Sequence, residues 1–396
     1  MVSDAIGRRW TARAAVRTTF CVHGLVSAAW VARIPQIKAE LGLTEGALGL
    51  ALLGSPVGVV IAVRFTGRIA ARWGSGPATR ASGVAAALAL VPLGLAGNLG
   101  ALTAALAVLG LALGVLDVAM NAQAVAVERR EGRPLMSGMH GAWSIGALCG
   151  ALTGSWAAHL HVPVPVHLGG AGAALALAAL LCTRGLLDGA AERLAFADDA
   201  DEGEGGRDGG ALRSARWSLL LLGVIGLCSF LGEGAMADWT AVYLRETLGT
   251  GAGFAGLGYA GCAVAMAAAR LAGDRVIAAV GPVRVLRTGG LLAAAALGAG
   301  LLSGDPVVSV IGFTLYGLGV AVVAPVTFGA AGNLPGVPAA TGISWVTSIG
   351  YTGFLAGPPV IGFVAQGIGL TWALAVPVAL ALLITALAGA ARTARR

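Results

Sequence analysis

The sequence predicts an all-α integral membrane protein with twelve transmembrane helices in two pseudo-symmetric six-helix bundles, and three observations predict it. Of its 396 residues, 57% are hydrophobic and only 11% are charged, whereas soluble proteins carry about 25% charged residues. Twelve apolar stretches each approach the roughly 20 residues that a helix needs to cross a bilayer. One long polar segment separates the first six stretches from the last six.

The twelve stretches are continuous apolar runs, which favours helices over the shorter, alternating strands of a membrane barrel. In the first half we expect helices at Ala14–Ala32, Ala47–Phe65, Thr79–Gly97, Ala101–Val125, Met136–Leu160 and Pro165–Leu187. In the second half we expect them at Trp217–Leu244, Ala252–Leu271, Val283–Leu302, Pro306–Phe328, Ala339–Ala365 and Leu370–Gly389. We interpret the first stretch as a helix and not as a removable signal peptide, because no convincing small-residue cleavage site follows it.

The distribution of basic residues predicts the orientation. Arg33, Lys38 and Arg245 would lie on one side of the membrane. The other side would hold both termini and the arginines at positions 8, 9, 13, 64, 68, 72, 80, 129, 130, 133, 270, 275, 284, 287, 392, 395 and 396. The positive-inside rule then places both termini in the cytoplasm. We therefore expect a multi-pass protein of the cytoplasmic (inner) membrane.

The polar segment 188–216 predicts the domain organisation. It is acidic and rich in glycine, a composition that cannot build a core and is typical of a flexible linker. We expect it to join an N-terminal bundle (1–187) to a C-terminal bundle (217–396) on the cytoplasmic side.

Several functional classes lack their sequence signals. The net charge of +7 is scattered between apolar stretches, so we expect no nucleic-acid partner. The five cysteines lie in apolar runs without zinc-site spacing, and His159, His161 and His167 have no carboxylate or cysteine nearby, so we expect no metal site. Catalytic and phosphate-loop motifs are missing from the sequence, which argues against an enzyme, an ATP-driven pump and a bound cofactor.

A repeated turn relates the two halves. After the second helix the chain reads RFTGRIAARWGSGPATR (64–80), and after the eighth it reads RLAGDRVIAAVGPVRVLR (270–287). This pattern resembles the signature loop of the major facilitator superfamily, in which glycine, a small residue, aspartate and arginine are followed by glycine and basic residues. The resemblance implies a conformational latch at Arg68, Arg72, Asp274 and Arg275. Ala71 departs from the family's acid, and the alternative is that these arginines only set orientation.

Further segments narrow the resemblance. LDVAMNAQAVAVE (116–128), MHGAWSIGALCG (139–150), GEGAMADWTAVYLRE (232–246) and GYTGFLAGPPVIG (350–362) resemble a bacterial permease branch related to the fucose permeases, which are sugar:proton symporters. The resemblance implies that helices 1, 4, 7 and 10 line a central cavity and that the bundles open alternately to either side.

The acids inside the predicted spans are the main candidate site residues, because a charge in the bilayer is costly and is usually functional. They are Asp117, Glu233 and Asp238. Asp117 and Asn121 share a helix face with Gly110 and Gly114, which would leave room beside the carboxylate. We expect Asn121 to donate to a substrate oxygen while Asp117 accepts; the alternative is a carboxylate that ties two helices together.

Glu233 lies between two glycines, and no arginine or lysine is expected at its depth. Because its charged form would be costly there, we expect it to carry a proton; the alternative is a hydrogen bond between packed helices. Asp238 lies nearer the extracellular end of its helix. We expect it equally to be a gate or structural cap and to be a substrate contact.

Aromatic residues and histidines complete the candidate set. His140 and Trp143 share a face of the fifth helix, where the histidine could relay protons and the indole could support a sugar ring. His23 on the first helix and Tyr351 on the eleventh are further candidates. Packing or interfacial anchoring is the alternative for His140.

Together these observations predict a monomeric, proton-coupled secondary transporter of a small polar solute such as a sugar. Its partners would be that small molecule, protons and the lipid bilayer. One alternative is an efflux carrier whose acids recognise a cationic apolar compound. Another is a membrane receptor that does not transport.

Overall fold

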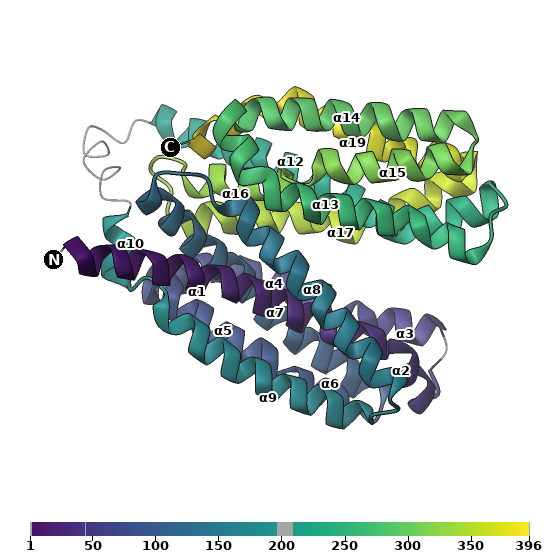
Figure 1. Cartoon of the computed structure of the whole chain (residues 1–396), viewed down its shortest axis with the longest axis horizontal. Helices are drawn as coiled ribbons and strands as arrows, with labels where there is room; N and C mark the ends of the chain where they lie inside the picture. Colours follow the sequence, from purple (N-terminus) through teal and green to yellow (C-terminus); the bar gives the residue numbers. More distant parts are fainter. Residues whose placement is uncertain (1, 44, 196–208, 396) are drawn as a thin grey trace. The chain divides into compact units, whose positions relative to one another are not determined.

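The computed structural model describes residues 2–43, 45–195 and 209–395, and these form helices joined by short turns (Figure 1). Close contacts divide the chain into two compact units. Unit 1 comprises Met1–Leu135, Met139–Gly206 and Pro338–Ser344, and unit 2 comprises Met136–Gly138, Arg207–Val337 and Trp345–Arg396. Residues 196–208 of the predicted linker (188–216) lie outside the described residues.

Unit 1 contains six long helical segments with short helices between them. In chain order they are α1 (Val2–Ala29), η1 (Val31–Arg33), α2 (Ile34–Glu40), α3 (Glu45–Leu52), α4 (Gly54–Trp73), α5 (Ser75–Leu88), α6 (Leu90–Gly94), α7 (Leu99–Glu131), α8 (Met136–His159), α9 (Val164–Cys182), η2 (Thr183–Gly185) and α10 (Gly189–Leu194). Local sequence sets the ends of α7: the Asn98 side chain accepts from the Ala101 N–H, and Gly132 adopts a left-handed conformation at φ 65°.

Unit 2 repeats this plan. Its helices are α12 (Gly209–Val242), the π-helical turn η3 (Tyr243–Thr247), α13 (Ala252–Val280), α14 (Pro282–Ser303), α15 (Pro306–Val320), α16 (Val323–Gly332), α17 (Ala339–Ile368), α18 (Leu370–Ala373), α19 (Ala375–Leu387) and η4 (Ala388–Arg395). Asp305 caps α15 by accepting from the N–H groups of Val307 and Val308.

Each of the twelve predicted stretches is helical, which confirms the all-α membrane fold class. Eight helical segments of the described chain are long and apolar enough to cross a membrane. The other four predicted spans correspond to α1, α5 with α6, α8 and α13. The eleventh helix runs through Pro358 and Pro359, although each proline removes a backbone donor and strains the preceding turn.

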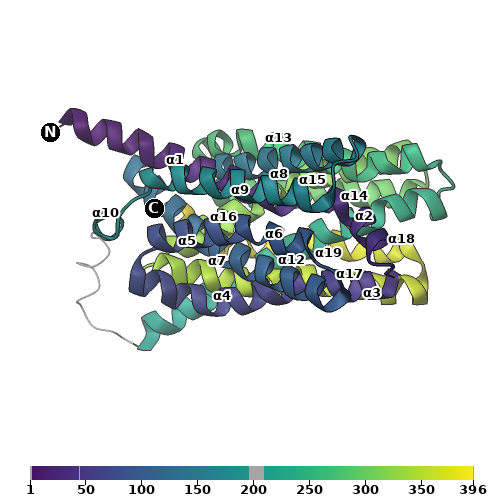
Figure 2. The same cartoon turned by 90° about the horizontal axis from the view of Figure 1, so that it is seen from below.

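Glycines let helix backbones approach closely within unit 1. A Cβ built on Gly58 of α4 would lie 2.1 Å from the Ala107 carbonyl oxygen, and one on Gly110 of α7 would lie 2.0 Å from the Ser55 carbonyl oxygen. Only residues without a side chain allow α4 to lie this close along α7 (Figure 2). The apolar core of the unit is built around these helices and includes Leu106 and Leu109, which are fully buried.

Candidate functional site

Glu233 on α12 forms an ion pair inside unit 2. Its Oε2 lies 3.3 Å from Nη2 of Arg270 on α13, and the two side chains are 15% and 7% exposed. Ser229 Oγ donates to Glu233 Oε1 over 3.0 Å, and Arg270 Nε donates to the Ala321 carbonyl over 3.0 Å. The negative charge of the carboxylate and the positive charge of the guanidinium therefore compensate each other within the apolar interior.

The prediction that Glu233 lacks a basic partner at its depth is wrong. Arg270 was expected in the cytoplasmic turn, but α13 continues to Val280, so Arg270 lies within the helix. An arginine also places its charge several ångströms from its Cα, because the aliphatic stem can lie along apolar neighbours. Counting residues from a helix end therefore misplaced the guanidinium.

The two glycines beside Glu233 accommodate aromatic rings. A Cβ on Gly232 would lie 1.9 Å from Oη of Tyr316, and one on Gly234 would lie 3.4 Å from the ring of Phe354. Tyr316 is fully buried, and its hydroxyl has no hydrogen-bonding partner among the residues that the structure describes. The glycines thus bring α15 and α17 against α12 at the two residues that flank Glu233.

Tyr351 belongs to an aromatic cluster one turn from Glu233. Its ring centroid lies 5.5 Å from that of Phe230, and Phe230 stacks on Phe354 at 4.9 Å. Phe230 comes from α12 and the other two residues come from α17. Asp238 is not part of this group: it is exposed, and its carboxylate makes no hydrogen bond or ion pair within the described chain.

Two separately predicted candidates meet in unit 1. Trp143 Nε1 on α8 donates to His23 Nδ1 on α1 over 2.6 Å. A close helix crossing makes this contact possible, since a Cβ on Gly24 would lie 2.1 Å from the Trp143 carbonyl oxygen. His140, one turn earlier on α8, packs edge-on against Phe20 with ring centroids 5.2 Å apart. We call these two neighbouring pairs, His23 with Trp143 and His140 with Phe20, the polar–aromatic cluster of unit 1.

Asp117 and Asn121 bond to each other along α7. Asn121 Nδ2 donates to the Asp117 carbonyl over 2.8 Å and to Asp117 Oδ1 over 3.2 Å, and both side chains are buried. The amide nitrogen expected to serve a substrate is therefore engaged within its own helix. The role expected of the glycines is also wrong, because Gly110 and Gly114 are filled by the backbone of α4.

The predicted latch residues differ in their contacts. Asp274 Oδ1 and Oδ2 accept from the backbone N–H groups of Ser137 and Gly138, each over 2.8 Å. These N–H groups begin α8, so the carboxylate satisfies the donors of a helix N-terminus. Arg68, Arg72 and Arg275 are exposed, and their guanidinium groups make no hydrogen bond or ion pair to the described residues.

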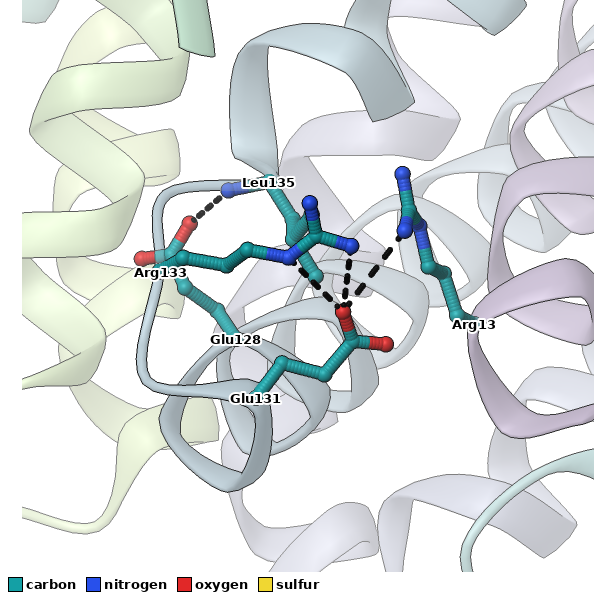
Figure 3. Close-up of polar contacts among 5 residues, drawn as sticks. All are labelled: Arg13, Glu128, Glu131, Arg133 and Leu135. Carbon is teal, nitrogen blue, oxygen red and sulfur yellow. Dashed lines mark hydrogen bonds and ion pairs between the residues drawn. The ribbon is translucent and has the colours of Figure 1, made fainter. Parts of the chain in front are cut away.

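The turn between α7 and α8 carries a second set of polar contacts (Figure 3). Glu131 Oε2 lies 3.6 Å from Arg13 Nη1 of α1 and 2.9 Å from Arg133 Nη2. Glu128 Oε2 accepts from the Leu135 N–H over 2.6 Å. These acids were not predicted as functional; Glu131 joins the turn to α1, and Glu128 bonds across the turn itself.

Comparison with known proteins identifies the family of this architecture. Residues 18–335 match the family model of the Major Facilitator Superfamily. The chain belongs to the major facilitator superfamily. It is 36% identical over 380 residues to an uncharacterised MFS-type transporter of Yersinia pestis, covering 96% of this chain and 95% of that protein. It is 30% identical over 370 residues to the membrane protein MosC of Rhizobium meliloti, covering 93% and 88%.

Solved structures show the same superfamily fold. FucP in its outward conformation aligns with a TM-score of 0.71 at 18% identity, covering 95% of this chain and 97% of FucP. The human organic anion transporter MFSD10 (TETRAN) aligns with a TM-score of 0.73 at 16% identity, covering 96% and 99%. The predicted resemblance to this superfamily is confirmed, and the chain is a multi-pass membrane protein of a transporter family.

Proposed function

We propose that the chain is a proton-coupled secondary transporter that moves a small polar solute, such as a sugar, across the cytoplasmic membrane by alternating access. Family membership supports secondary transport. The observation that carries the proton coupling is the buried pair of Glu233 and Arg270. Both termini lie in the cytoplasm in this proposal, as the distribution of arginines favours.

The ion pair links a proton to the substrate through one guanidinium. A proton on Glu233 removes the charge that Arg270 faces, so the guanidinium becomes available to a substrate oxygen such as a sugar hydroxyl. Loss of the proton restores the pair and displaces that oxygen. Because Ser229 and Ala321 already hold the two side chains in place, the exchange needs little rearrangement of the helices.

The polar–aromatic cluster of unit 1 supplies the proposed substrate contacts. Trp143 uses its indole N–H on His23, which leaves its ring face as an apolar surface for a sugar ring. Asp117 is fixed by Asn121, and the buried Asn121 Oδ1 has no partner in the described chain. Tyr351 and Asp238 stay proposed contacts of unit 2.

Asp274 is the proposed latch residue, because it holds the first turn of α8 in one arrangement. The alternative of cation efflux is less well supported, since Arg270 already neutralises Glu233. A receptor that does not transport would have no use for a protonatable pair in its interior.

Uptake by proteoliposomes tests the proposal. Radiolabelled sugars are offered with and without an inward proton gradient, and the gradient should drive uphill accumulation. Glu233→Gln mimics the protonated form, so it should lose accumulation while still exchanging substrate across the membrane. Glu246→Gln, at an exposed glutamate of η3, is the matched control and should behave as wild type. Normal accumulation by Glu233→Gln would exclude this carboxylate as the proton carrier.

A further inference from the structure

Unit 2 contains a basic cavity where α13 turns into α14. Its volume is about 490 Å³, and it is lined by the turn residues 280–283 and by Arg284, Arg287 and Arg392. The three arginines are exposed, and their guanidinium groups make no hydrogen bond or ion pair to the residues that the structure describes. No acidic side chain of the described residues lines the cavity. Three like charges around one cavity repel one another, which favours an anion among them.

The repeated turn of unit 1 shows what the same geometry binds. Gly74, between α4 and α5, has φ 85° and ψ 154°, and Gly281, between α13 and α14, has φ 87° and ψ 153°. In unit 1 an acid of this chain occupies the turn. Glu192 of α10 accepts from Ser75 N over 3.2 Å and from Ser75 Oγ over 2.7 Å. A carboxylate thus sits at the N-terminus of the helix that follows the glycine.

The arginine that ends each copy of the repeat also has a partner in unit 1 but lines the cavity in unit 2. Arg80, six residues after Gly74, donates through Nη2 to the Thr183 carbonyl over 2.9 Å and through Nε to Thr183 Oγ1 over 3.1 Å. Arg287, six residues after Gly281, instead lines the cavity. Among the described residues, no side chain accepts from the first backbone N–H groups of α14 in the way that Glu192 does at α5. The turn of unit 2 therefore has the geometry that binds a carboxylate in unit 1 and more arginines around it, and it can bind an anionic group from outside the described chain.

We propose that this cavity binds a phosphate group, either of an anionic phospholipid headgroup or of a soluble phosphate compound. Guanidinium groups match phosphate oxygens in pairs of parallel hydrogen bonds. The N-terminus of a 22-residue helix adds backbone donors and a favourable dipole. Three positive charges match the charge of a phosphate better than they match the single negative charge of a carboxylate such as Glu192, which occupies the turn of unit 1. The cavity also exceeds a bare phosphate in size, which leaves room for the alcohol attached to it.

Thermal unfolding of the purified full-length protein in dodecyl maltoside tests the proposal without reference to transport. Phosphatidylglycerol and cardiolipin should raise the unfolding midpoint, because a ligand of the folded state stabilises it by mass action. Phosphatidylcholine should not. Arg284→Gln with Arg287→Gln should weaken the apparent affinity by about tenfold or more. Arg64→Gln with Arg216→Gln removes the same charge at exposed positions that do not line the cavity and should respond as wild type.

Further measurements distinguish a lipid phosphate from a soluble phosphate compound. If inorganic phosphate raises the midpoint more than chloride of equal ionic strength does, and only with Arg284 and Arg287 both present, the ligand is soluble. Equal effects of chloride and phosphate, together with an unchanged lipid response in the double variant, would overturn the site. So would a large gain in lipid affinity on neutralising the five acids of 198–204, because the chain itself would then fill the cavity. Native mass spectrometry of Arg392→Gln, which should retain less bound lipid, gives a measurement that survives poor folding of the double variant.

Discussion

Removing one partner of the Glu233–Arg270 pair should destabilise the protein far more than removing both. At a separation of 3.3 Å and an effective dielectric constant of about 20, the attraction between two unit charges is ~5 kcal/mol. Desolvation of the two groups offsets most of this, so a pair replaced by neutral groups is often close to neutral in stability. A lone buried charge keeps the desolvation cost without the attraction.

The single variants should therefore each lose about 3–5 kcal/mol of unfolding free energy. Arg270→Gln should lose about 1 kcal/mol more than Glu233→Gln, because Nε also donates to the Ala321 carbonyl. The double variant should lie within about 2 kcal/mol of wild type, which gives a coupling energy of several kcal/mol between the two sites.

Denaturation in mixed detergent micelles, followed by tryptophan fluorescence and circular dichroism, measures these free energies. The matched controls are Arg245→Gln and Glu246→Gln, which change the same residue types at exposed positions of η3. Each control should unfold within about 0.5 kcal/mol of wild type. If the two site variants are as stable as the controls, or if their effects simply add in the double variant, the pair carries no buried electrostatic coupling and the mechanism built on it fails.

Four further predictions test the topology and the other site residues. A reporter that is active only in the cytoplasm should work when fused at Arg396 and should be silent near Asp305; activity at Asp305 would contradict the orientation. Asp274→Asn should cost about 1–2 kcal/mol of stability and slow transport, because the cap of α8 loses its charge. Ala71→Asp should be tolerated. Thermal unfolding and uptake measure both variants, after membrane insertion of each has been confirmed. Trp143→Phe should lose about 1 kcal/mol with its hydrogen bond to His23 but bind substrate better than Trp143→Ala, as calorimetry would show. Asp117→Asn should weaken substrate binding in the same assay while leaving gradient-driven accumulation measurable at high substrate concentration.

The helices were predictable because membrane hydropathy acts locally. A run of about 20 apolar residues can satisfy its backbone in lipid only as a helix, so each stretch could be identified without knowledge of its neighbours. Pro358 and Pro359 did not end the eleventh helix, since the apolar run around them continues. The ends of helices were less predictable: α13 extends nine residues beyond Leu271, to Val280.

The partners of the site residues could not be predicted from spacing alone. Helical periodicity correctly placed Asp117 and Asn121 one turn apart, but it could not show that α4 fills the space beside Gly110. The contact between His23 and Trp143 joins residues 120 positions apart. Glu192 and Ser75 are 117 positions apart. Each of these contacts depends on how helices cross, which is a property of the packed bundle.

Asp117 and Glu233 are held by different chemistry, and this difference argues for a division of roles. Asp117 accepts a hydrogen bond from the neutral amide of Asn121 in its own helix. Glu233 is held by the guanidinium of a neighbouring helix, so a proton on it leaves a buried positive charge that must find another oxygen. This second arrangement makes protonation and substrate binding depend on each other through a single group. For this reason we place the proton coupling at Glu233 and Arg270 and the fixed polar recognition at Asp117 and Asn121.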